Sequence, residues 1–230
     1  MHGKKTAETR EEELLKAAGE LFLQKGYEDT SVNSIVKSIG VSKGTFYYYF
    51  DSKEDLVDDL VEKISEPIYR KIDAIISDDS FSAVEKLNRI FTESTQIKLA
   101  NKEQVRRIFS LVYKPENLQL RNKIQNRTVE KSAKKTVKII KQGVEEGILN
   151  TQFPEEVSRL IFWMGMDLGE EMATRLLDPE AEAVTEEYIR EYRAYENAIE
   201  RVLGAPEGSI DFLDEEDLTE FLSYLNRSDM

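Results

Sequence analysis

The chain has 230 residues and a net charge of −13, and with 40% hydrophobic and 33% charged residues it can bury a core as one large or two small domains. It has no cysteine and a single histidine, His2, which excludes disulfides, thiol catalysis, Ser-His-Asp triads and metal sites built on these residue types. Neither a secretion signal nor an apolar run of about 20 residues is present, so we expect a cytoplasmic protein without metal or cofactor.

Helix start and stop signals recur along the whole chain, whereas the alternation typical of strands is nearly absent. Four helices are predicted before residue 80: one that ends at Gly26, two short ones that meet at Gly40, and a long one that begins at Ser52 and is kinked at Pro67. Further helices are predicted over residues 81–99, 105–113, 115–146, 154–177, 185–203 and 215–225. The predicted fold class is therefore all-α.

The two short helices around Gly40 have the pattern of a helix-turn-helix. The first carries an apolar stripe, the glycine allows a tight turn, and Ser42 can cap the second helix. In DNA-binding motifs of this kind, the second helix places its N-terminal side chains in the major groove. Here Phe46 and Phe50 lie four residues apart and point toward a core. The remaining faces of this helix carry Lys43, Thr45, Tyr47, Tyr48 and Tyr49.

This tyrosine-rich surface has two interpretations. Hydroxyl and ammonium groups can bind phosphate oxygens, and tyrosine rings can pack against sugars or thymine methyl groups. Alternatively, the three tyrosines are packing residues at the edge of a core, as aromatic residues at helical spacing usually are. The negative net charge of the chain does not argue against DNA, because residues 1–53 hold eight basic and eight acidic side chains.

Residues 30–56, TSVNSIVKSIGVSKGTFYYYFDSKEDL, closely resemble the signature of the TetR family of one-component transcriptional regulators. The matching parts are the Thr30-Ser31 start, the Gly40-Val41-Ser42 turn, the Gly44-Thr45-Phe46-Tyr47 core, Phe50, and the Ser52-Lys53-Glu54-Asp55-Leu56 start of the next helix. The first helix fits the same pattern, so the resemblance covers roughly residues 9–61. The chain departs from the family at Tyr48 and Tyr49, near which family members often have histidine.

The resemblance implies a ligand-responsive regulator, expected to be a repressor that binds a palindromic operator as a homodimer and is released by a small molecule. It implies a helix-turn-helix domain over residues 1–53 and a ligand-binding and dimerisation domain over 54–203, followed by an acidic extension with one short helix over 204–230. An alternative is a helical small-molecule-binding or scaffold protein whose head does not bind DNA. No enzyme is predicted, because the chain has no phosphate-binding glycine loop and no cysteine or histidine base.

The resemblance also implies which side chains of the head contact DNA. A phosphate at a helix N-terminus is favoured by the helix dipole and by free backbone amides. Phosphate contacts at such a site would come from Thr30 and Ser31. Base contacts would come from Lys43, Thr45 and Tyr48. Further contacts with the DNA backbone would come from Tyr47, Tyr49 and Lys53, and Ser42 would stand at the start of the second helix.

Two further sets of candidates lie in the body of the chain. Gly165 and Gly169 are four residues apart and allow close helix packing, either against a neighbour in the same chain or against a dimer mate. The candidate interface residues are Phe162, Gly165, Gly169, Tyr192, Tyr195 and Ile199. The candidate pocket residues are Phe91, Phe109, Tyr113 and Trp163, with Glu170 or Glu171 available to a cationic ligand. Alternatively, these aromatic residues are ordinary core and the glutamates form a solvated face.

Residues 204–230 hold one basic and eight acidic side chains and lie outside the resemblance. Leu218, Phe221, Leu222 and Leu225 share one helix face, and acidic residues at the start of this helix favour its formation. This face can dock on the body or on a dimer mate. Alternatively, the segment lies near the heads and repels non-specific DNA.

Overall fold

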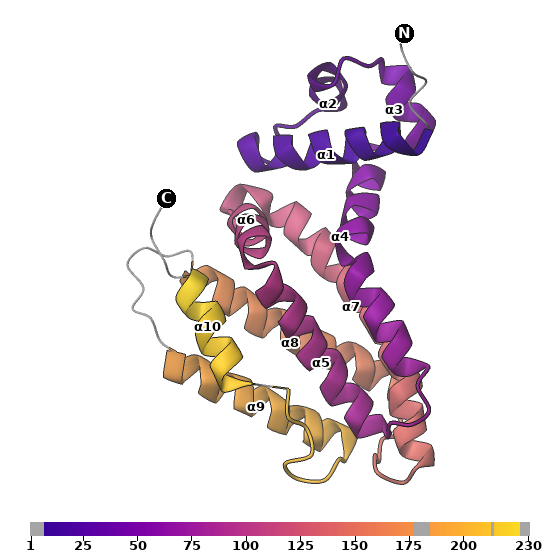
Figure 1. Cartoon of the computed structure of the whole chain (residues 1–230), viewed down its shortest axis with the longest axis vertical. Helices are drawn as coiled ribbons and strands as arrows, with labels where there is room; N and C mark the ends of the chain where they lie inside the picture. The colour runs from indigo at the N-terminus through magenta and orange to yellow at the C-terminus, as the bar shows by residue number, and fades with distance from the viewer. Residues whose placement is uncertain (1–6, 177–184, 213, 226–230) are drawn as a thin grey trace. The chain divides into compact units, whose positions relative to one another are not determined.

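The computed structural model describes residues 7–176, 185–212 and 214–225, and these ranges contain helices and no strand, which confirms the all-α fold class (Figure 1). The N-terminal helices are α1 (Ala7–Lys25), α2 (Val32–Ser38), α3 (Lys43–Tyr49) and α4 (Lys53–Ile76). They are followed by α5 (Ala83–Ala100), α6 (Lys102–Val112), the 3-10 helix η1 (Pro115–Asn117), α7 (Leu118–Glu145), α8 (Pro154–Leu176), α9 (Thr185–Leu203) and α10 (Glu215–Leu225). Each predicted helix is present, with ends that differ by a few residues.

Pro115 was expected to begin a long helix, and Pro67 was expected to kink another. The helix predicted from Pro115 begins at Leu118 instead, because residues 115–117 form a single 3-10 turn with the proline in its first turn. Helix α4 continues through Pro67, and the kink predicted there stays a prediction.

The chain divides into two compact units. The head unit comprises residues 1–66 and 110–124, and the body unit comprises residues 67–109 and 125–230. Helices α4, α6 and α7 each contribute residues to both units, so the chain passes between them three times. The predicted boundary at residues 53 and 54, which marks the start of α4, stays a prediction for the end of the DNA-binding domain.

The head unit is built around the buried faces of its short helices. Gly26 and Gly40 have φ values of 85° and 70°, a conformation that side-chain-bearing residues rarely adopt, and they end α1 and α2. Ser31 caps α2 in a reciprocal arrangement with Ser34, and Ser42 caps α3 by accepting from the Thr45 amide at 3.1 Å. The core of the unit contains Leu14, Leu15, Ala17, Ala18, Phe22, Tyr27, Ile35, Val36, Phe46, Phe50, Leu56, Val57 and Leu120.

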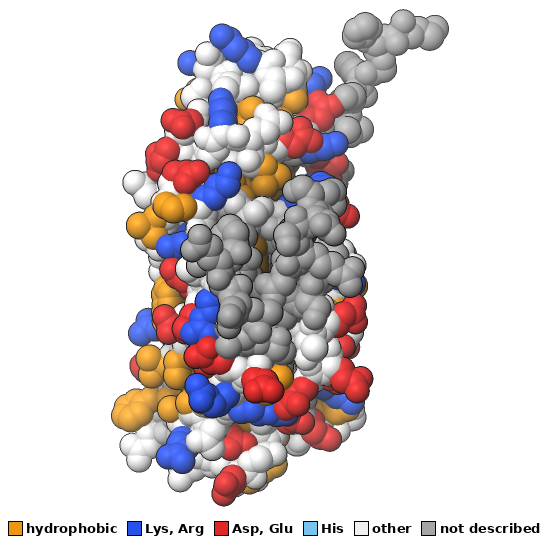
Figure 2. All heavy atoms as spheres, turned by 90° about the vertical axis from the view of Figure 1, so that its left-hand side faces the viewer, with side chains coloured by type: hydrophobic (Ala, Val, Ile, Leu, Met, Phe, Trp, Pro, Cys, Tyr) orange, Lys and Arg blue, Asp and Glu red, His pale blue; other side chains and the backbone are white. Residues whose placement is uncertain are grey.

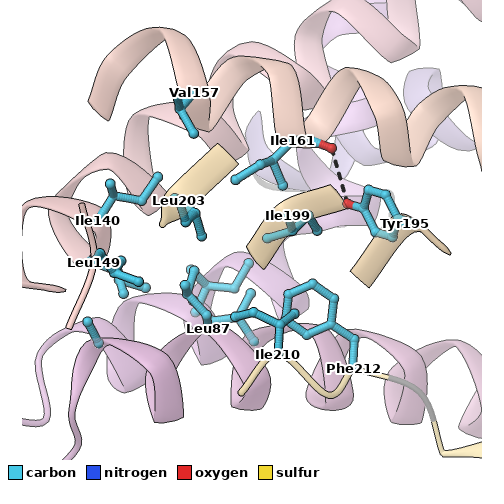
Figure 3. Packing of buried hydrophobic residues seen from close by; sticks show 14 residues of the cluster. Leu87, Ile140, Leu149, Val157, Ile161, Tyr195, Ile199, Leu203, Ile210 and Phe212 are labelled. Atoms are coloured by element: carbon cyan, nitrogen blue, oxygen red, sulfur yellow. Dashed lines mark hydrogen bonds between the residues drawn. The ribbon is translucent and has the colours of Figure 1, made fainter. Parts of the chain in front are cut away.

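The body unit has a separate core between α5, α7, α8 and α9. Figure 3 shows Leu87 of α5 facing Ile199 and Leu203 of α9, with Val157 and Ile161 of α8 above them. The Tyr195 hydroxyl of α9 donates a hydrogen bond to the Ile161 carbonyl at 3.1 Å. Both cores are thus formed by residues of a single chain.

The segment after α9 docks on the body unit. Ile210 and Phe212 are buried in the body core, and Leu218 of α10 packs with Tyr188 of α9. Two buried carboxylates of α9 accept the backbone amides of this segment: Glu200 binds the amide of Ile210 at 3.0 Å and Glu196 that of Phe212 at 2.6 Å. Salt bridges from Lys102 to Glu220 and from Arg193 to Asp211 and Glu215 extend the contact. Of the face predicted to dock, Leu218 therefore packs on the body, whereas the side chains of Phe221, Leu222 and Leu225 lie outside the described residues.

Candidate DNA-binding surface

The turn between α2 and α3 fixes the angle at which α3 leaves the head unit. The amide of Gly40 donates to the Lys37 carbonyl at 3.3 Å, and that of Val41 to the Val36 carbonyl at 2.9 Å. Phe46 and Phe50 are buried in the head core, as predicted from their spacing. One side of α3 is therefore anchored, and the other side is presented to solvent.

The exposed side of α3 carries most of the residues that the sequence indicated. Tyr47 and Tyr48 are 55% and 76% exposed, and Lys43 is exposed as well. Tyr49 is half-buried against the head core, and its ring meets that of Tyr48 edge-on with 4.8 Å between centroids. Packing at the core edge therefore accounts for Tyr49, whereas Tyr47 and Tyr48 are available to a partner.

The small hydroxyl residues have two different roles. Ser31 and Ser42 are exposed and stand at the N-termini of α2 and α3, and the half-buried Thr45 lies 3.0 Å from Ser42, oxygen to oxygen. Thr30 is fully buried, and its hydroxyl donates to the Gly26 carbonyl at 2.7 Å. The predicted phosphate contact by the Thr30 side chain does not fit this geometry, because the hydroxyl instead closes the loop between α1 and α2.

Lys53 is also engaged inside the head unit. Its ammonium donates to the Tyr27 carbonyl at 2.8 Å and lies 3.9 Å from the centroid of the Tyr27 ring. The Tyr27 hydroxyl in turn donates to Glu54 at 3.0 Å, and burial together with this carboxylate raises the pKa of Tyr27. The predicted phosphate contact of Lys53 therefore competes with a structural contact that the sequence did not indicate.

A second support of the head unit was missed by sequence analysis. Asn117 of η1 is buried, its side-chain oxygen accepts the Tyr27 amide at 2.9 Å, and its side-chain nitrogen donates to the Leu111 carbonyl at 2.8 Å. Lys123 of α7 donates to the Glu54 carbonyl at 2.8 Å. Partners 90 residues apart leave no local sequence pattern, and the only signal was an asparagine after a proline.

The candidate pocket residues lie in different local environments. Phe91 is stacked against Phe212 and Phe162, with centroids 3.7 and 6.1 Å apart, so it belongs to the packed body core. Glu170 accepts from Gln125 at 3.1 Å, and Glu171 pairs with Arg175. Of the remaining three, Phe109 is half-buried in the body unit, Trp163 is 38% exposed, and Tyr113 belongs to the head unit, with Arg121 over its ring.

The candidate interface residues turn out to be largely internal. Tyr195 and Ile199 are buried in the body core, and Phe162 stacks on Phe91. A Cβ at Gly165 would lie 2.9 Å from the Tyr195 hydroxyl, so this glycine permits packing within the chain. Tyr192 meets Tyr195 edge-on, and burial raises its pKa to about 12. At Gly169 an added Cβ meets no atom within 4 Å, so this position leaves room for a partner.

Two other classes of site were searched in the described part of the chain. It contains no group of three or more His, Asp or Glu side chains placed to hold a metal ion. None of its helices combines the length and apolarity of a membrane span.

Comparison with known proteins identifies the head. Residues 14–60, which contain the α2–turn–α3 unit, match the model of the family described as "Bacterial regulatory proteins, tetR family". This match is to the DNA-binding domain of the TetR family. The chain is 27% identical over 143 residues to the HTH-type transcriptional repressor KstR2 of Mycobacterium tuberculosis, covering 60% of this chain and 68% of KstR2. It is 28% identical over 156 residues to the fatty acid metabolism regulator protein of Bacillus subtilis, covering 67% and 78%.

The resemblance of fold to known proteins extends beyond the matched head. SmeT, the repressor of the Stenotrophomonas maltophilia multidrug efflux pump SmeDEF, has a TM-score of 0.60 at 17% identity, over 92% of this chain and 96% of SmeT. A SmeT–triclosan complex has a TM-score of 0.58 at 16% identity, over 88% and 95%. The fold of the helical body, and not only that of the head, is thus similar to the fold of SmeT.

Proposed function

We propose that this TetR-family regulator is a repressor that binds a palindromic operator as a homodimer and is released by a small molecule. The observation that carries the DNA-binding part is the anchored α3, which presents Lys43, Tyr47 and Tyr48 to solvent opposite the buried Phe46 and Phe50. The names of KstR2 and SmeT as repressors support repression, and the SmeT complex with triclosan supports a small-molecule effector.

In the proposed complex, α3 enters the major groove with its N-terminal turn. Lys43 and Thr45 then approach base edges, and Tyr48, the most exposed of the three tyrosines, reaches along the groove. Ser31 and Ser42 stand at helix N-termini, where backbone amides and the helix dipole favour a phosphate. Tyr47 packs against the sugar-phosphate backbone beside them.

For the second copy of the chain we propose a surface on α8 and α9. Hydrophobic side chains reach the molecular surface in several places among the charged ones (Figure 2). On these two helices Leu160, Trp163 and Val202 are 54%, 38% and 37% exposed. Burying such side chains against a second copy removes apolar surface from water, which favours association.

Selection of binding sites from random duplexes tests this function. We expect palindromic sites whose half-sites are spaced by about 10 bp or a multiple, because two heads on a two-fold axis need two symmetric half-sites. The double variant Leu160→Glu and Trp163→Glu should sediment as a monomer and lose tight binding to the palindrome. Weak, salt-insensitive binding to every duplex would instead favour a scaffold or ligand-binding protein with an incompetent head.

A matched pair of lysine variants separates DNA contact from folding in the head unit. Lys43→Ala should shift the sequence preference by roughly 1–3 kcal/mol at one position of each half-site, because a base contact is lost. Lys53→Ala should lower the melting temperature, because the Tyr27 carbonyl and ring lose their cation. Binding to a panel of half-site variants and thermal melts of both proteins measure these effects. An unchanged sequence preference for Lys43→Ala would contradict the assignment of Lys43 to base edges.

A further inference from the structure

Helix α3 contains a glycine that nothing in the described part of the chain explains. Gly44 is the second residue of this helix and is exposed. Glycine makes a helix less stable than alanine does, because it loses more conformational freedom on folding. Gly44 is helical and is not one of the glycines with a positive φ, so a residue with a side chain can adopt its backbone conformation.

A methyl group would fit at Gly44 without a clash inside the chain. A Cβ added there would lie 3.5 Å from the hydroxyl oxygen of Ser42, which is an ordinary van der Waals distance. Apart from its chain neighbours and the backbone of its own helix, no other described atom lies within 4 Å of that position. Tyr47 and Tyr48 follow on the same face of α3, three and four residues later, but their rings leave this space open.

Two other helical glycines show what an internal requirement looks like. A Cβ at Gly143 would lie 2.5 Å from the side chain of Leu149, and a Cβ at Gly165 would lie 2.9 Å from the hydroxyl of Tyr195. Packing within the chain therefore requires glycine at both positions. Gly44 has no such contact, so the reason for its missing side chain lies outside the folded chain.

The position of Gly44 on α3 indicates what this outside partner is. Lys43 and Thr45 flank it in the sequence, and both approach base edges in the proposed complex. Tyr47 and Tyr48 are exposed about one turn, roughly 5 Å, further along the helix. The face presented to DNA thus has a bare stretch of backbone in its first turn, beside long side chains in the next.

We propose that Gly44 is the point of closest approach between α3 and DNA, where a base edge in the major groove occupies the space of the missing Cβ. This inference rests on the proposed function, because it assigns a further specificity-determining residue to the same surface. Without a side chain at residue 44, α3 lies deeper in the groove, and Lys43 and Thr45 come within hydrogen-bonding distance of the bases. A methyl group at this position lifts the first turn of the helix away from those base edges.

The variant Gly44→Ala tests the proposal, because its expected effects on stability and on binding have opposite signs. The melting temperature should equal or exceed the wild-type value, since alanine favours the helix. Affinity for the palindromic duplex selected by the wild-type protein should fall about tenfold or more, as for a mismatched base pair. Affinity for a scrambled duplex should change little, because non-specific binding depends on phosphate contacts. Thermal melts and fluorescence anisotropy titrations of the full-length proteins measure these effects.

Gly19→Ala is the matched control in the same head unit. A Cβ at Gly19 would lie 3.8 Å from the side chain of Leu60, so a methyl group also fits there. Gly19 is half-buried in α1 and is not part of the exposed surface of α3. Gly19→Ala should therefore keep or raise the melting temperature and bind the selected duplex as tightly as the wild-type protein does.

Three results would overturn the assignment of Gly44. The first is wild-type affinity of Gly44→Ala for the selected duplex. The second is a lower melting temperature of this variant, which would show that folding itself requires the glycine. The third is an equal loss of affinity for the selected and the scrambled duplex, which would place the DNA backbone at this position instead of a base edge. A wild-type protein that prefers no duplex would overturn the proposed function, and the inference with it, before any variant is compared.

Discussion

Truncation of the chain after Leu203 is expected to lower the melting temperature markedly and to expose apolar surface that binds a hydrophobic dye. The truncation removes Ile210 and Phe212 from the body core. The ring centroid of Phe212 lies 3.7 Å from that of Phe91, so this stacking contact is lost as well. Replacing a buried phenylalanine by alanine costs about 3–5 kcal/mol, so Phe212→Ala should reproduce most of the effect. Thermal and urea-induced unfolding of both variants measure the loss.

The polar contacts of the segment add to this loss. Glu196 and Glu200 are 3% and 5% exposed, and their described acceptor contacts include the amides of Phe212 and Ile210. Without residues 204–230, these carboxylates face the gap that the segment leaves, and the body must open to hydrate them. Glu207→Ala, which changes an exposed residue of the same segment, is the matched control and should melt like the wild-type protein.

The truncation also tests whether the acidic extension repels DNA. Its removal deletes eight acidic side chains and one basic one. Charge repulsion predicts nearly unchanged melting, with tighter non-specific binding at low salt that fades as the Debye length falls below about 10 Å. Docking predicts the opposite pattern, with a large loss of stability and unaltered low-salt affinity. The contacts of Phe212 favour docking.

Local sequence signals were sufficient for the helices and for the shape of the DNA-binding surface. Gly26, Gly40 and Ser42 act on the backbone of their own turns, so their roles do not depend on the rest of the fold. The burial of Phe46 and Phe50 follows from their spacing on one short helix. These features were predicted because cause and effect lie within a few residues.

The expected roles of Tyr195, Ile199 and Thr30 do not fit the packing within the chain. Tyr195 and Ile199 carry the apolar surface expected of a dimer interface, but α8 and α5 of the same chain cover it. Thr30 has the residue type of a phosphate ligand, but the end of α1 takes its hydroxyl.

Asn117 provides the second large expected effect. Asn117→Ala removes the acceptor of the Tyr27 amide, which is 90 residues away in sequence. It also removes the donor to the Leu111 carbonyl, which is 6 residues away. A buried backbone amide that loses its acceptor costs about 1–3 kcal/mol. We therefore expect the head unit to lose about this much stability, with the first effects in the loop that joins α1 to α2.

Amide hydrogen exchange locates this effect. The Tyr27 amide should exchange roughly five- to 150-fold faster in Asn117→Ala, which is the ratio that corresponds to a loss of about 1–3 kcal/mol. Glu116→Ala changes the exposed neighbour in the same 3-10 turn and should leave Tyr27 protected. Equal Tyr27 exchange in Asn117→Ala and in the wild-type protein would show that the turn merely lies against the head. Faster exchange would make residues 110–124 a structural part of the DNA-binding head, because Tyr27 also holds Lys53 at the start of α4.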